Sequence, residues 1–214
     1  MAEMMKGNEA IAEAAIRAGA RFYAGYPITP SSEIMEYLSW RMNEVGGAFV
    51  QAESELAGIN MVIGASSCGV RALTASSGPG ISLKQEGIST LCDEGLPAVV
   101  ITQVRYGNGL GTLFTSQCDY HRETRGGGQG DYRCIVLCPS SIQEFVDLML
   151  PAYELAEKYR IVTIMMGEGT LGQMMEPVEL PDFVEPKRTP WALNGHYTYK
   201  KIGIFERDSM AEAV

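Results

Sequence analysis

The sequence contains few of the residues on which metal-dependent and histidine-dependent enzymes rely. Its 214 residues include only two histidines, His121 and His196, and five cysteines without the Cys-x-x-Cys spacing of zinc or redox sites. The cysteines are Cys68, Cys92, Cys118, Cys134 and Cys138. Because their number is odd, we expect reduced, mostly buried thiols rather than disulfides. The sequence therefore predicts no metal site and no histidine-centred catalysis.

Long apolar runs and an excess of positive charge are also missing. No segment approaches the roughly 18 consecutive apolar residues of a membrane span, and the first residues lack the layout of a signal peptide. The formal net charge is −9, from 17 Lys and Arg against 26 Asp and Glu, which opposes binding along a phosphate backbone. We therefore expect a cytoplasmic protein with neither a membrane nor a nucleic acid as partner.

The apolar pattern of the sequence alternates between helix and strand. It predicts helices over 8–18, 31–42, 53–65, 80–91 and 141–158 and strands over 21–26, 48–52, 70–75, 98–103, 132–137 and 160–166. Uninterrupted apolar strands between helices indicate a parallel sheet that is covered on both faces. The fold class is therefore predicted to be a doubly wound, mainly parallel α/β domain.

Two segments lack this alternation. Residues 104–131 form a long connection with seven of the 24 glycines, and connections of this length in a compact domain tend to be functional. Residues 173–214 hold four of the ten prolines and have no regular apolar period before 201–205. We predict an α/β domain over 1–172 and a proline-rich linker or docking arm over 173–214, which could begin a second domain that this chain lacks.

A Gly-x-Gly-x-x-Gly pattern stands at Gly167 to Gly172, directly after a predicted strand, where a dinucleotide-binding fingerprint would lie. Such a fingerprint must open a helix that leads to a second strand, whereas a proline-rich stretch follows here. We therefore predict a glycine turn after the last strand. An ordinary dinucleotide-binding protein is kept as a third hypothesis, which NAD binding by the isolated chain would support.

Four groups of chemistry-bearing residues follow predicted strands, so they should meet at the carboxyl edge of the sheet, where α/β proteins bind ligands. They are Gly25–Ser32, Glu53 with Glu55, Thr74–Gly80, and Arg105. The two prolines Pro27 and Pro30 give a rigid bend that holds Ile28 and Thr29 at this edge. The edge is therefore the predicted site.

Each of these residues also has a purely structural interpretation. Glu53 and Glu55 could serve the helix cap and dipole, or one of them could be a catalytic carboxylate. Arg105 could be a solvated loop charge, or a planar fork that binds a carboxylate with two hydrogen bonds. The small residues Ser77 and Gly78 before a helix suit close approach of a polar ligand, although many strand-to-helix turns share this composition.

Three tracts together resemble a known family. They are Tyr26-Pro27-Ile28-Thr29-Pro30-Ser31-Ser32, Glu53-Ser54-Glu55-Leu56-Ala57-Gly58 and Thr74-Ala75-Ser76-Ser77-Gly78-Pro79-Gly80. Their order and spacing resemble the α subunit, or pyrimidine-binding domain, of the 2-oxoacid:ferredoxin oxidoreductases over residues 7–180. Gln117-Cys118-Asp119, Gly130-Asp131-Tyr132-Arg133 and Pro139-Ser140-Ser141 look most like the branched-chain 2-ketoisovalerate type, with the 2-oxoglutarate type a close second.

The resemblance implies a role for one glutamate. In this family, which uses thiamine diphosphate, a glutamate hydrogen-bonds N1′ of the aminopyrimidine and promotes loss of the thiazolium C2 proton. Glu55 matches this role, because a Glu-x-Ala continuation with Gly64 nine residues further on is typical of such enzymes; Glu53 is the less favoured candidate. The resemblance also implies that Pro27 and Ile28 lie beside the cofactor.

The remaining site residues follow from the same resemblance. Thr29 and Arg105 would contact the carboxylate of the 2-oxoacid, and Ser77 and Gly78 would lie near the cofactor with a smaller role. No metal ligand is assigned to this chain. The loop 107–112 departs from the more usual Gly-Gly-Pro-Ser-Thr-Gly tract, which puts its own substrate contacts in question.

Other parts of such an enzyme are absent from the sequence. It has no Gly-Asp-Gly motif for the diphosphate and Mg²⁺, and no cysteine cluster for an iron–sulfur centre. In this family a β subunit would supply the former, and γ and ferredoxin-like subunits would carry electrons to ferredoxin. The family's α subunits are usually longer, so we expect a truncated or naturally short subunit that is inactive alone.

Two hypotheses follow for the function. In the first, the chain is one subunit of a complex that oxidatively decarboxylates a 2-oxoacid, with 2-ketoisovalerate favoured, to an acyl-CoA and passes electrons to ferredoxin. In the second, it is a non-catalytic α/β scaffold that only binds partner subunits. The altered 107–112 loop and the missing later domain favour the second, whereas the order of the three motifs favours the first.

Overall fold

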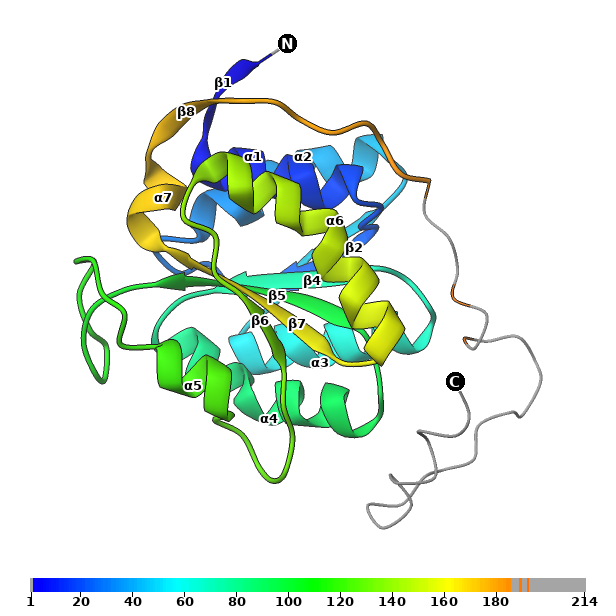
Figure 1. Ribbon diagram of the computed structural model, residues 1–214. Helices are drawn as coiled ribbons and strands as arrows, with labels where there is room; N and C mark the ends of the chain where they lie inside the picture. Colours follow the sequence, from blue (N-terminus) through cyan, green and yellow to red (C-terminus); the bar gives the residue numbers. More distant parts are fainter. Residues whose placement is uncertain (1, 186–188, 190–191, 193–214) are drawn as a thin grey trace.

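The computed structural model describes residues 2–185, 189 and 192 and contains a six-stranded parallel sheet (Figure 1). Its strands are β2 (Phe22–Gly25), β3 (Ala48–Gln51), β4 (Ala72–Ser76), β5 (Ala98–Val104), β6 (Ile135–Leu137) and β7 (Val162–Glu168). They lie in the order β3-β2-β4-β5-β7-β6, and every neighbouring pair is parallel. The predicted doubly wound α/β fold is confirmed.

Helices cover both faces of this sheet. The longer ones are α1 (Gly7–Arg17), α2 (Ser32–Glu44), α3 (Glu55–Ser67), α4 (Pro79–Asp93) and α6 (Ile142–Tyr159). Figure 1 shows α1, α2 and α6 on one face and α3 and α4 on the other. Each face has its own apolar core, one built around Ile11, Leu38 and Phe145 and the other around Ile59 and Ile88. Burial of both faces explains why the central strands are uninterruptedly apolar.

The connection after β5 and the segment after β7 contain structure that the apolar pattern did not reveal. A short helix α5 (Tyr120–Arg125) lies inside the connection 104–131. A five-residue helix α7 (Gly169–Gln173) follows β7, and β8 (Met175–Val178) then pairs antiparallel with β1 (Glu3–Lys6). These elements are too short to show a readable period.

The pairing of β8 with β1 attaches the first residues of the predicted arm to the domain. Beyond β8, the backbone N–H of Val184 donates to the carbonyl of Arg17 at 2.7 Å, and the guanidinium of Arg17 stacks over the ring of Phe183. The boundary between 172 and 173 stays a prediction. The apolar stretch noted at 201–205 lies outside the described residues.

All five cysteines lie in the described residues and none of them forms a disulfide, but the expectation that most of them are buried is wrong. Only Cys92 is buried, whereas Cys118 and Cys138 are exposed and the other two are half-buried. Both exposed thiols lie beyond the carboxyl ends of strands, in segments that the core does not cover. Within the described residues, none of the helices is long and apolar enough to cross a membrane.

Candidate functional site

The strand order places one particular edge of the sheet in the position where α/β proteins bind ligands. From β2 the chain moves outward to β3 and then returns to β4 on the other side of β2, so the order reverses between β2 and β4. A crevice forms outside the carboxyl ends of strands at such a switch point. The segments after β2, β3, β4 and β5 all begin at this edge, as the sequence predicted.

Glu55 is the first residue of α3 at this edge. Ser54 caps the helix by accepting a hydrogen bond from the amide of Ala57 at 3.1 Å, so its side chain faces the backbone and Glu55 begins the first turn. Glu55 is 7% exposed, whereas Glu53 is exposed. In the described part of the chain, no side chain donates a hydrogen bond to the Glu55 carboxylate, which is thus available to a ligand.

The Glu55 carboxylate packs against the start of α4. A Cβ atom added to Gly80 would lie 2.7 Å from Glu55 Oε1 and would collide with the hydroxyl of Ser76. Gly80 therefore makes room for the carboxylate. The hydroxyls of Ser76 and Ser77 are fully buried and have no hydrogen-bond partner among the described residues. Buried hydroxyls without partners are uncommon and are expected where a ligand completes the site.

Thr29 and Arg105 are brought into direct contact. Arg105 Nη1 donates to the Thr29 carbonyl at 2.7 Å, and Nη2 donates to the Leu110 carbonyl at the same distance. The guanidinium passes over Gly78, where an added Cβ would lie 2.7 Å from Arg105 Nε. The Nε atom is buried and unpartnered in the structure. The loop after β5, the turn after β4 and the bend after β2 thus meet at the guanidinium of Arg105.

The glycines of the loop after β5 form a closed turn rather than an extended arm. Thr112 N–H donates to the carbonyl of Tyr106 at 2.7 Å, and Tyr106 N–H donates to the carbonyl of Phe114 at 2.8 Å. Gly111 has a φ of +64°, and a Cβ there would lie 2.5 Å from the Tyr106 carbonyl oxygen. This turn places the Leu110 carbonyl beside Arg105, although residues 107–112 do not have the more usual Gly-Gly-Pro-Ser-Thr-Gly sequence.

The bend after β2 is held by a network that joins distant parts of the chain. Asn8 Nδ2 donates to the carbonyl of Pro30 at 2.7 Å, and Gln103 Nε2 donates to Asn8 Oδ1 at 2.9 Å. Gln173 Nε2 adds a second bond to the Pro30 carbonyl at 3.2 Å. Within the bend itself Ile28 is half-buried, and its carbonyl accepts bonds that hold the chain toward α2. Pro27 is exposed at the edge.

The turn after β4 is fixed from the other side by α5. Arg122 Nη1 donates to the Gly78 carbonyl at 3.1 Å and to the hydroxyl of Ser82. Arg122 is itself held by ion pairs with Asp119 and Glu123 at 3.1 and 2.9 Å. Burial raises the pKa of the Glu123 carboxyl, and attraction to Arg122 opposes this shift. The otherwise irregular connection 104–131 thus anchors the site.

Sequence reasoning missed several of the residues that form this site. Lys84, Asn8, Gln103 and Arg122 contact or fix the predicted residues from elsewhere in the chain. A signal existed for Lys84, because it stands three residues after Ile81 and four before Ile88 on the apolar face of α4. The other three give no comparable signal, since their partners lie 22 to 95 residues away.

Among the described residues, the cavities at the two edges of the sheet differ greatly in size. One of about 790 Å³ lies between the connection 104–131 and the carboxyl ends of β6 and β7, next to Val104, which precedes Arg105. Its polar and apolar lining includes Gln117, Tyr120, Cys138, Ser140, Met166 and Glu168. It is large enough for a small ligand and adjoins the predicted site.

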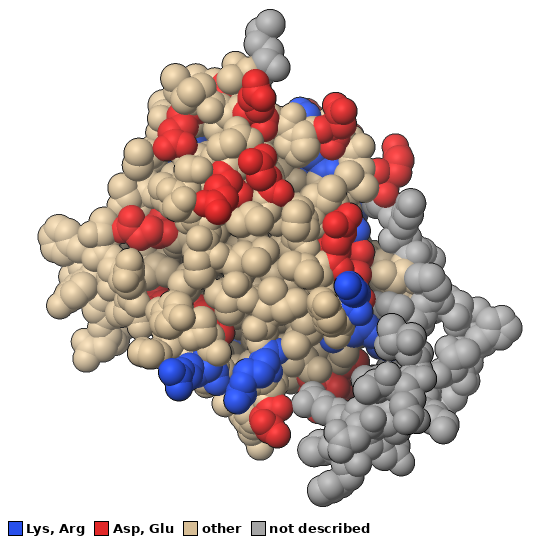
Figure 2. Space-filling model, in the orientation of Figure 1, with Lys and Arg blue, Asp and Glu red and all other residues tan. Residues whose placement is uncertain are grey.

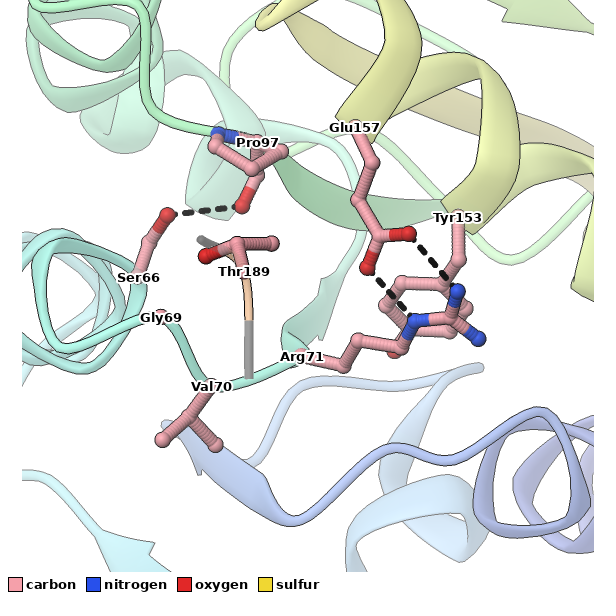
Figure 3. A pocket seen from close by; sticks show the side chains of 8 residues that line it. All are labelled: Ser66, Gly69, Val70, Arg71, Pro97, Tyr153, Glu157 and Thr189. Carbon is pink, nitrogen blue, oxygen red and sulfur yellow. Dashed lines mark hydrogen bonds and ion pairs between the residues drawn. The ribbon is translucent and has the colours of Figure 1, made fainter. Parts of the chain in front are cut away.

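The other cavity, of about 10 Å³, lies at the opposite edge of the sheet (Figure 3). Figure 3 shows Arg71 paired with both oxygens of Glu157, at 2.6 and 2.7 Å, and lying over the ring of Tyr153. Ser66 donates to the carbonyl of Pro97. Arg71 and Glu157 pair with each other, whereas the buried hydroxyls of Tyr153 and Thr189 have no partner among the described residues. This space holds one water at most and leaves no room for a larger ligand, so we assign it a structural role.

The Gly-x-Gly-x-x-Gly pattern forms the turn that the sequence predicted and not a dinucleotide fingerprint. It opens α7, which is five residues long and leads to the antiparallel β8. Its glycines permit close packing instead: an added Cβ would collide with Asn8 at Gly172 and would lie 2.7 Å from Pro30 Cγ at Gly169. The third hypothesis loses its structural support.

Comparisons with known proteins agree with this geometry. Residues 13–204 match the family described as pyruvate flavodoxin/ferredoxin oxidoreductase, thiamine diphosphate-binding. The ketoisovalerate oxidoreductase subunit VorB of Methanothermobacter marburgensis is 51% identical over 90% of this chain and 55% of its own length. The 2-oxoglutarate synthase subunit KorA of Methanocaldococcus jannaschii is 46% identical over 86% of this chain and 50% of its own length.

A solved structure is similar as well. The 2-oxoglutarate:ferredoxin oxidoreductase from Magnetococcus marinus, with 2-oxoglutarate, coenzyme A and succinyl-CoA bound, matches with a TM-score of 0.85 and 32% identity. The match covers 94% of this chain and 36% of that chain. The present chain spans about half the length of the curated relatives that it matches. On the combined basis of its fold, its edge residues and these similarities, the chain belongs to the thiamine diphosphate-binding pyruvate flavodoxin/ferredoxin oxidoreductase family.

Proposed function

We propose that the chain supplies the aminopyrimidine half of a thiamine diphosphate site in a 2-oxoacid:ferredoxin oxidoreductase. The complex would decarboxylate a 2-oxoacid oxidatively to an acyl-CoA and pass the electrons to ferredoxin. Similarity to the VorB subunits supports 2-ketoisovalerate as the substrate, and similarity to the KorA subunits makes 2-oxoglutarate the next to be tested. The isolated chain would be inactive.

The observation that carries this proposal is the environment of Glu55. Its carboxylate is nearly buried, lies against Gly80 just after the carboxyl end of β4, and receives no hydrogen bond from a described side chain. Such a group is suited to pair with a ring nitrogen of a ligand that enters the crevice. The buried hydroxyl of Ser77 has no partner among the described residues and could bond to the same ligand, while Gly78 beside it makes room for the Arg105 guanidinium.

Each remaining residue then has a role. Bound thiamine diphosphate would supply the carbanion chemistry, which no amino-acid side chain provides. Glu55 would hold N1′ of the pyrimidine and move a proton there, while Pro27 and Ile28 would line the pyrimidine from the bend after β2. Thr29 and Arg105 would bind the carboxylate of the 2-oxoacid, with the Arg105 fork exchanging its backbone partners for the carboxylate oxygens.

The other components would come from partner subunits. A β subunit would carry the diphosphate and Mg²⁺ site, and γ and ferredoxin-like subunits would hold the iron–sulfur clusters that reduce ferredoxin. The relatives' names identify them as subunits, which supports assembly with partners. A cytoplasmic location stays a prediction.

The test is reconstitution of the complex. The chain is co-expressed with the subunits encoded beside it, and reduction of a viologen dye is followed with 2-ketoisovalerate or 2-oxoglutarate and CoA. We expect turnover by the complex, none by the chain alone, and the higher kcat/KM with 2-ketoisovalerate. Calorimetry of the assembled complex should show binding of thiamine diphosphate with Mg²⁺; no binding would contradict the proposal and support a non-catalytic scaffold.

The exposed part of the loop after β5 is where we propose that the β subunit docks. Leu110, Leu113 and Phe114 are 82%, 63% and 75% exposed, and residues 106–116 carry no charge. Figure 2 shows this loop as an uncharged projection, while acidic side chains are scattered over other parts of the same face. Exposed apolar side chains beside an incomplete site suit burial against the subunit that completes it.

Replacing Phe114 by aspartate is expected to weaken assembly with the β subunit at least about tenfold, because an interface would have to bury the new charge. The dissociation constant is measured by titration of the labelled chain. Tyr159→Asp is the matched control, since Tyr159 is 59% exposed but lies at the far end of α6. Equal weakening by both substitutions would rule out docking through this loop.

A further inference from the structure

Lys84 is a lysine in the core of the protein. It lies on α4 with an exposed fraction of 0%, on the face that carries Ile81 and Ile88. Lysine side chains are almost never fully buried without a partner that neutralises their charge. Among the described ion pairs, none includes Lys84.

The ammonium of Lys84 instead contacts the first turn of α3. Its Nζ donates a hydrogen bond to the backbone carbonyl of Glu55 at 3.2 Å. Gly58, on the same turn, approaches both the lysine and the end of β2: an added Cβ would lie 3.4 Å from Lys84 Nζ and 3.2 Å from Gly25 Cα. The lysine therefore stands where α3, α4 and β2 meet, beneath the carboxyl edge of the sheet.

Helix α4 thus touches Glu55 at two points. Lys84 holds the backbone of Glu55, and Gly80, one turn earlier on α4, provides the surface on which the Glu55 carboxylate rests. Two contacts from one helix fix both the position and the direction of a side chain. A carboxylate that must reach a ligand atom within hydrogen-bond distance depends on such support.

The charge of Lys84 also costs stability. Burial lowers the pKa of Lys84 to about 8, and attraction to Glu55 opposes this shift. An apolar side chain of the same length would fill the space without this desolvation cost. Residues that reduce stability without serving the core are expected at functional sites.

We propose that Lys84 is a positioning residue, which orients Glu55 for its contact with the aminopyrimidine by holding the first turn of α3. The inference rests on the proposed function, because it assigns Lys84 a part in the same thiamine diphosphate site. Lys84 does not touch the ligand in this role. It acts through Glu55, by its hydrogen bond to the backbone and by its positive charge next to the carboxylate.

The test compares Lys84→Met with Lys84→Gln in the assembled complex. Methionine has a similar volume and removes both donor and charge, whereas glutamine keeps a donor. Ile88→Val is the matched control, a small loss of packing one turn further along the same face of α4. The readouts are the rate of hydrogen–deuterium exchange at C2 of bound thiamine diphosphate, kcat and KM, and amide exchange over residues 55–59 in the cofactor-free chain.

We expect Lys84→Met to slow C2 exchange and to lower kcat about tenfold or more, with KM for the 2-oxoacid within about twofold of wild type. Amide exchange in the first turn of α3 should accelerate in this variant. Lys84→Gln should fall between Lys84→Met and wild type, and Ile88→Val should leave C2 exchange unchanged. If Lys84→Met does not assemble, the test rests on Lys84→Gln. Slowed C2 exchange in Lys84→Gln then supports the proposal, and C2 exchange at the wild-type rate overturns it.

Wild-type C2 exchange in Lys84→Met would overturn the inference, and so would an equal decrease in Ile88→Val. These results differ from failure of the proposed function. If the wild-type complex does not bind thiamine diphosphate, the proposed function and this inference both fail. If it binds and Glu55→Gln slows C2 exchange while Lys84→Met does not, only the role of Lys84 is rejected.

Discussion

Replacing Glu55 by glutamine is expected to lower kcat of the reconstituted complex about 100-fold or more, which is the range for loss of a group that moves a proton in the reaction. Glutamine has nearly the same shape, so it can keep its contact with Gly80, but it has no carboxylate to hold and exchange the proton at N1′. The rate is measured as dye reduction at saturating 2-oxoacid, CoA and thiamine diphosphate.

Glu53→Gln is the matched control for this substitution. Glu53 lies two residues earlier in the chain and is exposed, and the atoms nearest to a Cβ added at Gly80 belong to Ser76 and Glu55. Its substitution should change kcat by less than about twofold, as expected for a solvated surface charge. Full activity of Glu55→Gln would reject the assigned role, and loss of activity only in Glu53→Gln would transfer that role to Glu53.

Replacing Arg105 by methionine is expected to lower kcat/KM for the 2-oxoacid about 100-fold, or about 2.7 kcal/mol. The physical reason is the loss of two fixed N–H donors, which now hold Thr29 and Leu110 and would bind the two carboxylate oxygens of the substrate. Arg105→Lys should recover only part of the loss, because an ammonium cannot present a planar pair of donors. Initial rates at varied 2-oxoacid concentration give the measurement.

Arg125→Met serves as the control for a general effect of charge. Arg125 is an exposed cation on α5, in the same long connection as Arg105. The Arg125→Met substitution should leave kcat/KM within about twofold of wild type, since exposed charges contribute little interaction energy. If Arg105→Met leaves kcat/KM for the 2-oxoacid within about twofold of wild type, Arg105 does not bind the substrate and its contacts with Thr29 and Leu110 are structural.

Much of the fold could be predicted from the sequence because long buried elements have readable periods. Helix α6 and strands β5 and β7 were predicted within a few residues of their observed bounds. The short helices α5 and α7 were missed because six residues or fewer show no readable helical period. The β1–β8 pairing joins Glu3 to Val178, and no local pattern indicates such a distant partner.

The candidate site could be predicted in part for a different reason. In a parallel sheet the carboxyl ends of all strands lie at one edge, so residues that follow strands are brought together whatever the strand order. This rule places Thr29, Glu55, Ser77 and Arg105 at the same edge. It does not specify contacts, and the bonds from Arg105 to the Thr29 and Leu110 carbonyls became visible only in the structure.

The sequence by itself determined the α/β class, the edge that carries the site and the residues that resemble a thiamine diphosphate motif. Only the tertiary structure decided that Glu55 is buried while Glu53 is exposed, and that Lys84, 29 residues from Glu55, holds its backbone. The physical reason is that periodicity shows which face of an element is buried, but the partner of that face depends on strand order and on packing between distant segments.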